Sequence, residues 1–200
     1  MAVYRRLLRA LGPQRWWPAR SAFEVMVGAI LTQATAWHNV ERAVANLRAA
    51  RVLSARRLAH LNPGALQRLV RPAGTFRQKT ARLQIFSRWY LQRFQGRSQR
   101  MFRDDPWVLR RQLLDVPGIG SETADSILLY AGRQPIFVVD TYTRRIFGRH
   151  ALTDESASYE AVQRHVLDRL PTDSRLFNEF HALLVAVGKR YCHRRDPDCS

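Results

Sequence analysis

Lysine, cysteine and acidic residues are scarce in this sequence, and these shortages argue against certain folds and binding sites. Lys79 and Lys189 are the only lysines, so arginine supplies all the other basic residues. The only cysteines are Cys192 and Cys199. A structural disulfide is uncommon in a cytoplasmic protein, so we favour metal or cluster ligation over a disulfide-stabilised fold. Two ligands alone do not complete a closed metal site.

Long hydrophobic runs are missing as well. The apolar run 25–31 is far shorter than the ~20 residues that span a bilayer, and the N-terminus lacks a signal-peptide pattern. We therefore expect a cytoplasmic, nucleoid-associated protein with no membrane partner. With 200 residues, 46% of them hydrophobic, the chain can form one large domain or two small ones with a shared core.

The net charge of +17 indicates a polyanionic partner, because each phosphate that a basic residue neutralises releases condensed counterions. The arginines are spread along the chain, which suits a broad docking face better than a single basic tail. An arginine-rich proteome is the alternative explanation for this charge.

Apolar residues recur at helical spacing, and no segment shows the sustained alternation of a strand, so we predict an all-α fold. Ser21 and Glu24 form a capping box before an apolar helix that should be buried. In the helix over 76–95 we assign Lys79 to a basic outer face. The predicted helices cover about 3–11, 22–34, 36–50, 54–60, 63–70, 76–95, 104–114, 121–131, 141–149, 155–169 and 173–191.

The segment 113–149 has the features most suggestive of chemistry. Its turn, Val116-Pro117-Gly118-Ile119-Gly120, joins two predicted helices; both glycines can adopt positive φ and allow a phosphate to approach the backbone. The N–H groups that open the next helix can also donate to an anion. An ordinary helix–helix turn is the alternative. The residues predicted to contact the DNA backbone are Gly118, Ile119, Gly120, Ser121 and Thr123.

Asp140 is the candidate catalytic carboxylate. It follows the apolar run 136–139 and precedes a predicted helix start at Thr141, where the helix dipole favours an ionised side chain. A helix N-cap without chemistry is the alternative, and one carboxylate can fill both roles.

These motifs resemble the helix-hairpin-helix (HhH-GPD) DNA glycosylases of the endonuclease III superfamily, and the likeness covers nearly the whole chain. Two further stretches carry it: Ala29-Ile30-Leu31-Thr32-Gln33-Ala34-Thr35, and 180–189 followed by Cys192. The resemblance implies a monomer that binds double-stranded DNA, flips a damaged base and breaks its N-glycosidic bond. Asp140 would then stabilise the positive charge that develops on the sugar and orient the attacking water.

The family pattern also assigns roles to other residues. Gln33 is expected to enter the duplex near the flipped base. At the position of Glu122 the bifunctional members carry a lysine that forms a Schiff base, so Glu122 predicts a glycosylase without strong lyase activity. The pattern around Glu122 is most similar to the 3-methyladenine glycosylases, whose pockets are aromatic. Trp17 and Trp37, more than Trp16, are expected to face the base, and Glu122 can line the same pocket.

Cys192-x6-Cys199 is similar to the first half of the loop that holds a [4Fe–4S] cluster in many relatives. Either the sequence is a truncated reading of a cluster protein, which we favour, or the cluster is absent. The 200 residues alone cannot supply four cysteines. For Lys189 we expect a buried structural role.

The expected fold is bilobal. A helical barrel covers 22–139 and includes the hairpin at about 104–131; the second lobe combines 1–21 with 140–200, and DNA lies across the cleft between the lobes. Two other functions stay open: an endonuclease III-like glycosylase and lyase for oxidised pyrimidines, and a non-catalytic helix-hairpin-helix DNA-binding protein.

Overall fold

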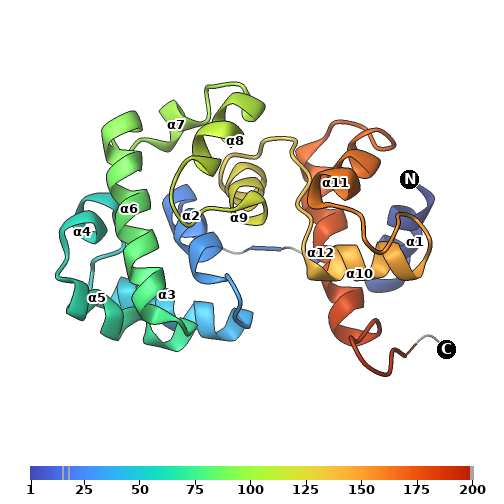
Figure 1. Cartoon of the computed structure of the whole chain (residues 1–200), viewed down its shortest axis with the longest axis horizontal. Coiled ribbons are helices and arrows are strands. Elements are labelled where there is room, and N and C mark those ends of the chain that lie inside the picture. Colours follow the sequence, from blue (N-terminus) through green and yellow to red (C-terminus); the bar gives the residue numbers. More distant parts are fainter. Residues whose placement is uncertain (15, 18, 199–200) are drawn as a thin grey trace. The chain divides into compact units, whose positions relative to one another are not determined.

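A computed structural model describes residues 1–14, 16, 17 and 19–198 of the chain. Within these residues the regular elements are all helical, which confirms the predicted fold class (Figure 1). None of the described helices is long and apolar enough to cross a membrane. The helices are α1 (Ala2–Leu11), α2 (Ala22–Leu31), α3 (Trp37–Ala49), α4 (Ala55–His60), α5 (Pro63–Val70), α6 (Phe76–Phe94), α7 (Ser98–Met101), α8 (Pro106–Leu114), α9 (Ser121–Ser126), α10 (Thr141–Arg149), α11 (Tyr159–Leu167) and α12 (Ser174–Arg190), with a 3-10 turn at Arg71–Ala73 and a π-helical turn at Ile127–Ala131.

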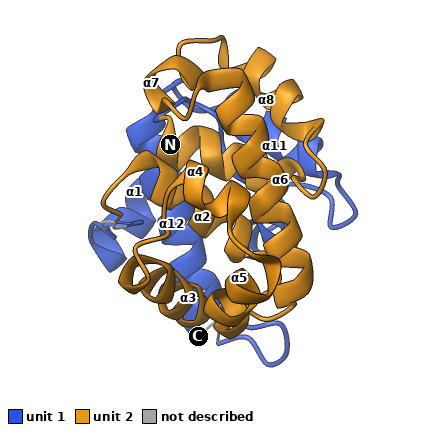
Figure 2. Cartoon of the chain, turned by 90° about the vertical axis from the view of Figure 1, so that its left-hand side faces the viewer, with its two compact units in different colours: residues 1–18, 133–200 blue, residues 19–132 orange. Residues whose placement is uncertain are grey.

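The chain divides into two compact units (Figure 2). Unit 1 comprises Met1–Pro18 and Arg133–Ser200, and unit 2 comprises Ala19–Gly132. Residues 133–139 thus lie in unit 1, whereas the sequence interpretation ended the first domain at residue 139. The reason is the packing of Phe137, whose ring meets that of Phe177 edge-on at 5.8 Å, while the Gln163 amide donates to its carbonyl at 2.6 Å.

Unit 2 is built around α2. The Ser21 hydroxyl accepts a hydrogen bond from the Glu24 N–H at 3.2 Å, which confirms the predicted cap. Every residue from Glu24 to Leu31 is buried, as the apolar sequence predicts, and α2 contacts α3, α6 and α9. A buried α2 therefore fixes the loop that follows it, which carries Gln33.

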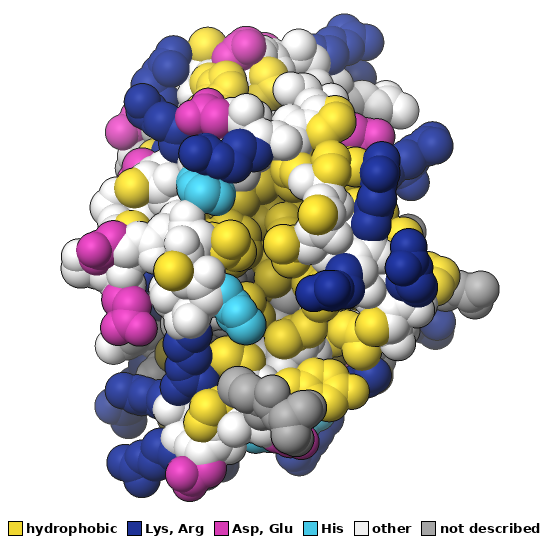
Figure 3. All heavy atoms as spheres, turned by 90° about the vertical axis from the view of Figure 1, so that its right-hand side faces the viewer, with side chains coloured by type: hydrophobic (Ala, Val, Ile, Leu, Met, Phe, Trp, Pro, Cys, Tyr) yellow, Lys and Arg dark blue, Asp and Glu magenta, His cyan; other side chains and the backbone are white. Residues whose placement is uncertain are grey.

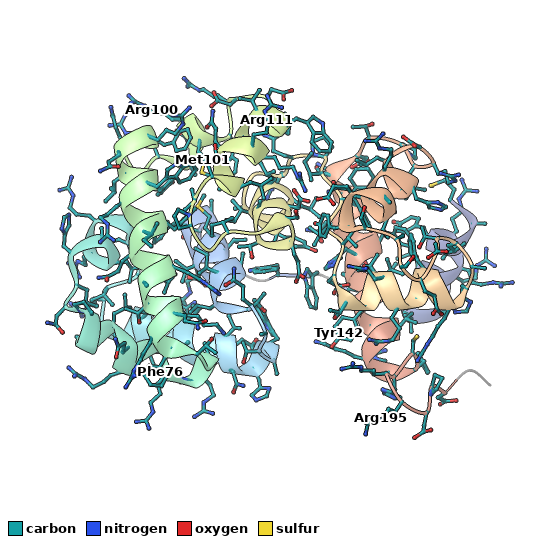
Figure 4. All side chains as sticks on the ribbon, viewed as in Figure 1. Phe76, Arg100, Met101, Arg111, Tyr142 and Arg195 are labelled. Atoms are coloured by element: carbon teal, nitrogen blue, oxygen red, sulfur yellow. The ribbon has the colours of Figure 1, made fainter. Side chains whose placement is uncertain are left out.

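Unit 1 is built around α12, which packs against α1 and α10. Phe177, Phe180 and Leu183 on its inner face are almost fully buried. The close approach of α10 depends on Gly188, because a Cβ there would lie 2.3 Å from the ring of Tyr142, which is labelled in Figure 4. This packing holds the start of α10, and with it Asp140, against α12.

Candidate functional site

The predicted hairpin is formed by α8, the turn 115–120 and α9, all within unit 2. Val116 and Ile119 are buried, and the Ile119 N–H donates to the Val116 carbonyl at 3.0 Å. Pro117, Gly118 and Gly120 are exposed. The buried side chains of Val116 and Ile119 therefore hold the turn in the core, while its two glycines are exposed to solvent.

The two glycines of the turn differ in what they require. Gly118 has φ +88°, and a Cβ at this position would lie 2.6 Å from Cγ of Arg82, so both conformation and space demand glycine. Gly120 has φ −97°, which any residue adopts, and a Cβ there would meet no atom within 4 Å. Only at Gly120 does the missing side chain leave open space at the surface.

A buried ion pair braces the hairpin. Nε and Nη2 of Arg110, on α8, donate to the two carboxylate oxygens of Asp125, on α9, at 2.6 and 3.1 Å. The Asp125 side chain is fully buried, and the Arg110 guanidinium also lies 5.9 Å from the centre of the Trp107 ring. This two-point contact fixes the angle between the hairpin helices.

Arg100 and Arg111, both exposed and labelled in Figure 4, lie on α7 and α8.

Gln33 lies against the hairpin. Its amide nitrogen donates to the Gly118 carbonyl at 3.0 Å and to the Thr123 hydroxyl at 2.9 Å. Its amide oxygen accepts a hydrogen bond from Nη1 of Arg82. The structure thus brings together three residues with predicted DNA-binding roles, Gln33, Gly118 and Thr123. Sequence reasoning gave Arg82 no specific role.

Asp140 is the N-cap of α10 in unit 1. Its Oδ1 accepts a hydrogen bond from the Thr143 N–H at 2.7 Å, and its Oδ2 lies 3.5 Å from Nε2 of His181 on α12. The side chain is 12% exposed. The carboxylate is therefore held at two points, while a small part of its surface stays open to solvent.

This environment keeps Asp140 ionised. Burial raises its pKa, but the charge and hydrogen bond of His181 and the hydrogen bonds from Thr143 outweigh burial, and the net pKa is lowered. Sequence reasoning missed His181 as a partner, although it lies within the stretch 180–189 that carried the resemblance. Asp140 and His181 are 41 residues apart in the sequence, and this spacing does not predict their contact, because the contact depends on α10 packing against α12.

The aromatic residues predicted for a base pocket are divided between the units. Trp37 begins α3 in unit 2, whereas Trp16 and Trp17 belong to unit 1 and meet edge-on at 6.5 Å. All three are half-buried. Lys189 is exposed, and its Nζ lies 5.6 Å from the centre of the Trp16 ring. The expectation of a buried Lys189 was therefore wrong: the side chain lies over an aromatic ring at the surface.

The structure also corrects the position of the other lysine. Lys79 is fully buried within unit 2, where its ammonium donates to the Ala73 carbonyl of the 3-10 turn. Burial, followed by the charge of Arg82, lowers the pKa of Lys79 to about 8. It does not belong to the basic outer face predicted for the helix. Glu122, in the first turn of α9, is exposed.

The described residues do not fit an iron–sulfur cluster. Cys192 is buried, and its sulfur accepts a hydrogen bond from Nη1 of Arg149 at 3.3 Å. Its carbonyl accepts from Arg145. No group of three or more His, Cys, Asp or Glu in the described part of the chain is arranged to hold a metal, and Cys199 lies outside that part. Such a cluster requires four thiolates, and the described residues supply one, that of Cys192.

Two hollows lie among the described residues of unit 1, and neither is lined by Asp140 or by the predicted aromatic residues. One, of about 690 Å³, is strongly basic and lies along α10. The other, of about 210 Å³, is mainly apolar; Figure 3 shows hydrophobic side chains gathered on this face of unit 1 with basic side chains around them. The basic hollow is lined by Thr141, Arg144, Arg145, Gly148, Arg149, Glu155 and Arg194.

Comparison with known families gives a match over most of the chain. The family described as "HhH-GPD superfamily base excision DNA repair protein" matches residues 27–172. A protein of Methanocaldococcus jannaschii, named "Putative DNA repair glycosylase MJ1434", is 40% identical over 195 residues, which are 96% of this chain and 88% of that protein. Endonuclease III of Thermotoga maritima is 28% identical over 88% of this chain and 78% of its own length.

Solved structures agree with this family fold. The 3-methyladenine DNA glycosylase MagIII of H. pylori, bound to 1,N6-ethenoadenine, superposes with a TM-score of 0.80 and 29% identity, covering 94% of this chain and 96% of that one. An endonuclease III trapped in a covalent complex with DNA gives a TM-score of 0.85 and 19% identity over 98% and 87% of the two chains. The second likeness concerns the fold alone.

Proposed function

We propose that this chain, which belongs to the HhH-GPD superfamily of base excision DNA repair proteins and is a DNA N-glycosylase, removes alkylated bases such as 3-methyladenine. It acts on double-stranded DNA by direct hydrolysis of the N-glycosidic bond, without strong lyase activity. Membership of this enzyme family leaves no support for the alternative of a non-catalytic DNA-binding protein.

The observation that carries the hydrolytic mechanism is the residue at position 122. Glu122 occupies the place in the hairpin helix where the resemblance puts the lysine of bifunctional relatives, and a carboxylate cannot form a Schiff base. Neither lysine of the chain replaces it. Lys79 is buried in unit 2, and Lys189 lies over Trp16 in unit 1.

Each unit contributes different groups to this reaction. In unit 2 the backbone at Gly120 and the first turn of α9 grip a phosphate, and Gln33 enters the duplex as the damaged nucleotide flips out. In unit 1 Asp140 faces the developing positive charge on the sugar and orients the attacking water. An anion fixed before the reaction begins stabilises such a transition state without reorganising. The low pKa of Asp140 suits this role because the carboxylate is charged at neutral pH.

An alkylated purine as substrate is supported by the likeness to a 3-methyladenine glycosylase at 29% identity. A cationic base stacks favourably on aromatic faces, and Trp17 and Trp37 are each a candidate for such a contact. Trp16 is the weaker candidate because Lys189 already places a cation near its ring. Glu122 is exposed and is a further candidate for contact with the base.

A second substrate class keeps specific support. The 28% identity to endonuclease III of Thermotoga maritima favours an oxidised pyrimidine, processed with strand cleavage. This reaction needs an amine nucleophile, which position 122 does not supply.

The test compares the unmodified protein with Asp140→Asn on two duplexes, one methylated and one carrying an oxidised pyrimidine. Released bases are identified by mass spectrometry, and parallel reactions are reduced with borohydride. We expect 3-methyladenine from the unmodified protein alone and no trapped adduct. Release of the oxidised pyrimidine together with a trapped adduct would replace this proposal with the second one, and no release from either duplex would overturn both.

A further inference from the structure

The side chain of Gln33 is held at both ends of its amide. Its Nε2 carries two protons, and two acceptors, the Gly118 carbonyl and the Thr123 hydroxyl, match them at 3.0 and 2.9 Å. Its Oε1 accepts from the Arg82 guanidinium. Three different elements therefore meet at this amide: the turn of the hairpin, helix α9 and helix α6.

The partners fix which end of the amide is oxygen. A guanidinium can only donate, so the atom facing Arg82 must be the acceptor Oε1. A backbone carbonyl can only accept, so the atom facing Gly118 must be the donor Nε2. A flipped amide would place like groups together at both ends, and the orientation of Gln33 is therefore determined by the network.

Arg82 is well placed to control this amide. It projects from α6, a helix of 19 residues anchored in the core of unit 2 by buried residues such as Leu83 and Phe86. Its aliphatic stem lies against the α-carbon of Gly118, where a Cβ would be 2.6 Å from Cγ and 2.9 Å from Cδ of Arg82. One side chain thus touches both the glycine turn and Gln33.

We propose that Arg82 is a positioning residue that fastens Gln33 to the DNA-gripping turn, so that the inserted side chain and the backbone clamp engage the duplex as one unit. This inference rests on the proposed insertion role of Gln33. Without Arg82 the amide keeps its two donor contacts but loses the charge-assisted bond that fixes its oxygen. Gln33 would then sample other rotamers, and inserting it would cost more conformational entropy.

The test is a double-mutant cycle on binding to a duplex that contains a tetrahydrofuran abasic analogue opposite 2-aminopurine. Fluorescence of the 2-aminopurine reports insertion of Gln33, and titration gives the dissociation constant. We expect Arg82→Ala to weaken binding about tenfold, the scale of one charge-assisted hydrogen bond. In a Gln33→Ala background the same change should matter less than about twofold. Arg82→Lys should restore part of the affinity, because an ammonium can still donate to Oε1.

Two outcomes would overturn the inference. Equal losses from Arg82→Ala in both backgrounds would mean that Arg82 acts on the fold or on DNA directly. A decrease of about one in the slope of log affinity against log salt concentration would identify Arg82 as a phosphate contact. Arg77→Ala, at an exposed arginine on the same helix, is the matched control and should give the same factor in both backgrounds.

The abasic duplex has no damaged base to release, so this measurement is independent of the substrate test. A protein that binds the duplex with the expected coupling but releases no alkylated base would disprove the proposed substrate alone. Release of 3-methyladenine together with equal losses in both backgrounds would disprove the role of Arg82 alone.

Discussion

Asp140 and His181 face each other across the contact between α10 and α12, with Oδ2 of the carboxylate 3.5 Å from Nε2 of the imidazole. The other carboxylate oxygen caps α10 through the Thr143 N–H. The candidate catalytic group is therefore also a structural group, and variants must separate these two roles.

Asp140→Asn makes that separation. The amide oxygen of asparagine can still accept from Thr143, and asparagine is a good N-cap, so we expect the fold and the DNA affinity to be retained. Loss of the fixed negative charge should lower the single-turnover rate of base release by roughly 100- to 1,000-fold. Asp173→Asn, which changes the N-cap of α12 in the same unit, is the control and should leave the rate near that of the unmodified protein. A normal rate for Asp140→Asn would remove Asp140 from the mechanism.

The pH dependence of base release tests the role of His181. Burial raises the pKa of Asp140, and His181 is the largest of the influences that lower it. In the unmodified protein Asp140 becomes protonated only below its ordinary value of about 4, so no acid limb from this group is expected above that pH. In His181→Ala burial is less opposed, the pKa rises, and the acid limb should move upward into the measurable range.

Single-turnover rates between pH 4 and pH 7 would show that movement. His165→Ala is the matched control, because His165 lies in the same unit, stacks edge-on against Phe147 and is not among the influences on the pKa of Asp140. If the profiles of both histidine variants coincide with that of the unmodified protein, His181 does not influence the reacting carboxylate.

Gly118→Ala should reduce stability, whereas Gly120→Ala should reduce DNA affinity. At Gly118 the new Cβ meets Arg82 in a backbone conformation that L-residues avoid, so we expect a loss of about 1–3 kcal/mol in unfolding free energy. At Gly120 the Cβ enters open space, so stability should change little while the affinity for undamaged duplex falls. Thermal melting and fluorescence anisotropy distinguish the two. A stable Gly120→Ala variant with full affinity would show that phosphates do not approach there.

Glu122→Lys should add lyase character. The substitution puts an amine in the first turn of α9, where the helix dipole lowers the pKa of an ammonium and favours the nucleophilic free amine. We expect borohydride to trap a covalent complex on abasic duplex for this variant and none for the unmodified protein. Glu160→Lys makes the same change in the first turn of α11 and should trap nothing. Equal trapping by both variants would indicate unspecific reaction.

Helix positions were predictable because they depend on local patterns. Capping residues and apolar periodicity located all the helices except the four-residue α7, Ser98–Met101. The predicted 22–34 helix ends early, at Leu31, and its last three positions instead form the loop in which Ala34 has φ +51° and Gln33 turns toward the hairpin. No periodic signal encodes that bend.

The site was predictable only in part. Motif positions identified Gln33, the hairpin and Asp140 as separate candidates, but His181 and Arg82 act through contacts between elements distant in sequence. The same limit applies to Phe137, which the sequence interpretation grouped with residues 22–139 although its ring contacts Phe177 and Phe180 on α12. It also explains why the burial of Lys79 and Lys189 was predicted wrongly. A long lysine side chain can lie inside or outside a helix bundle, depending on the acceptor available.

Lys79 gives a last prediction, on stability. Its pKa of about 8 in the folded state lies below the ordinary 10.5, so between these values the unfolded chain binds more protons than the folded one. The unfolding free energy should therefore rise with pH across that window, by at most about 1.4 kcal/mol per pH unit. Below pH 8 the full cost of burying the ammonium is present. Lys79→Met removes this dependence, although it leaves the Ala73 carbonyl without its donor, a loss that does not vary with pH.

Urea titrations at several pH values between 7 and 10.5 would measure the difference in stability between the unmodified protein and Lys79→Met. We expect this difference to shift steadily in favour of the unmodified protein as pH rises. Lys189→Met is the matched control, because Lys189 is exposed and its replacement leaves the buried ammonium of Lys79 in place. A difference between the unmodified protein and Lys79→Met that stays constant with pH would mean that Lys79 keeps its ordinary pKa, and that its ammonium reaches water in the folded protein.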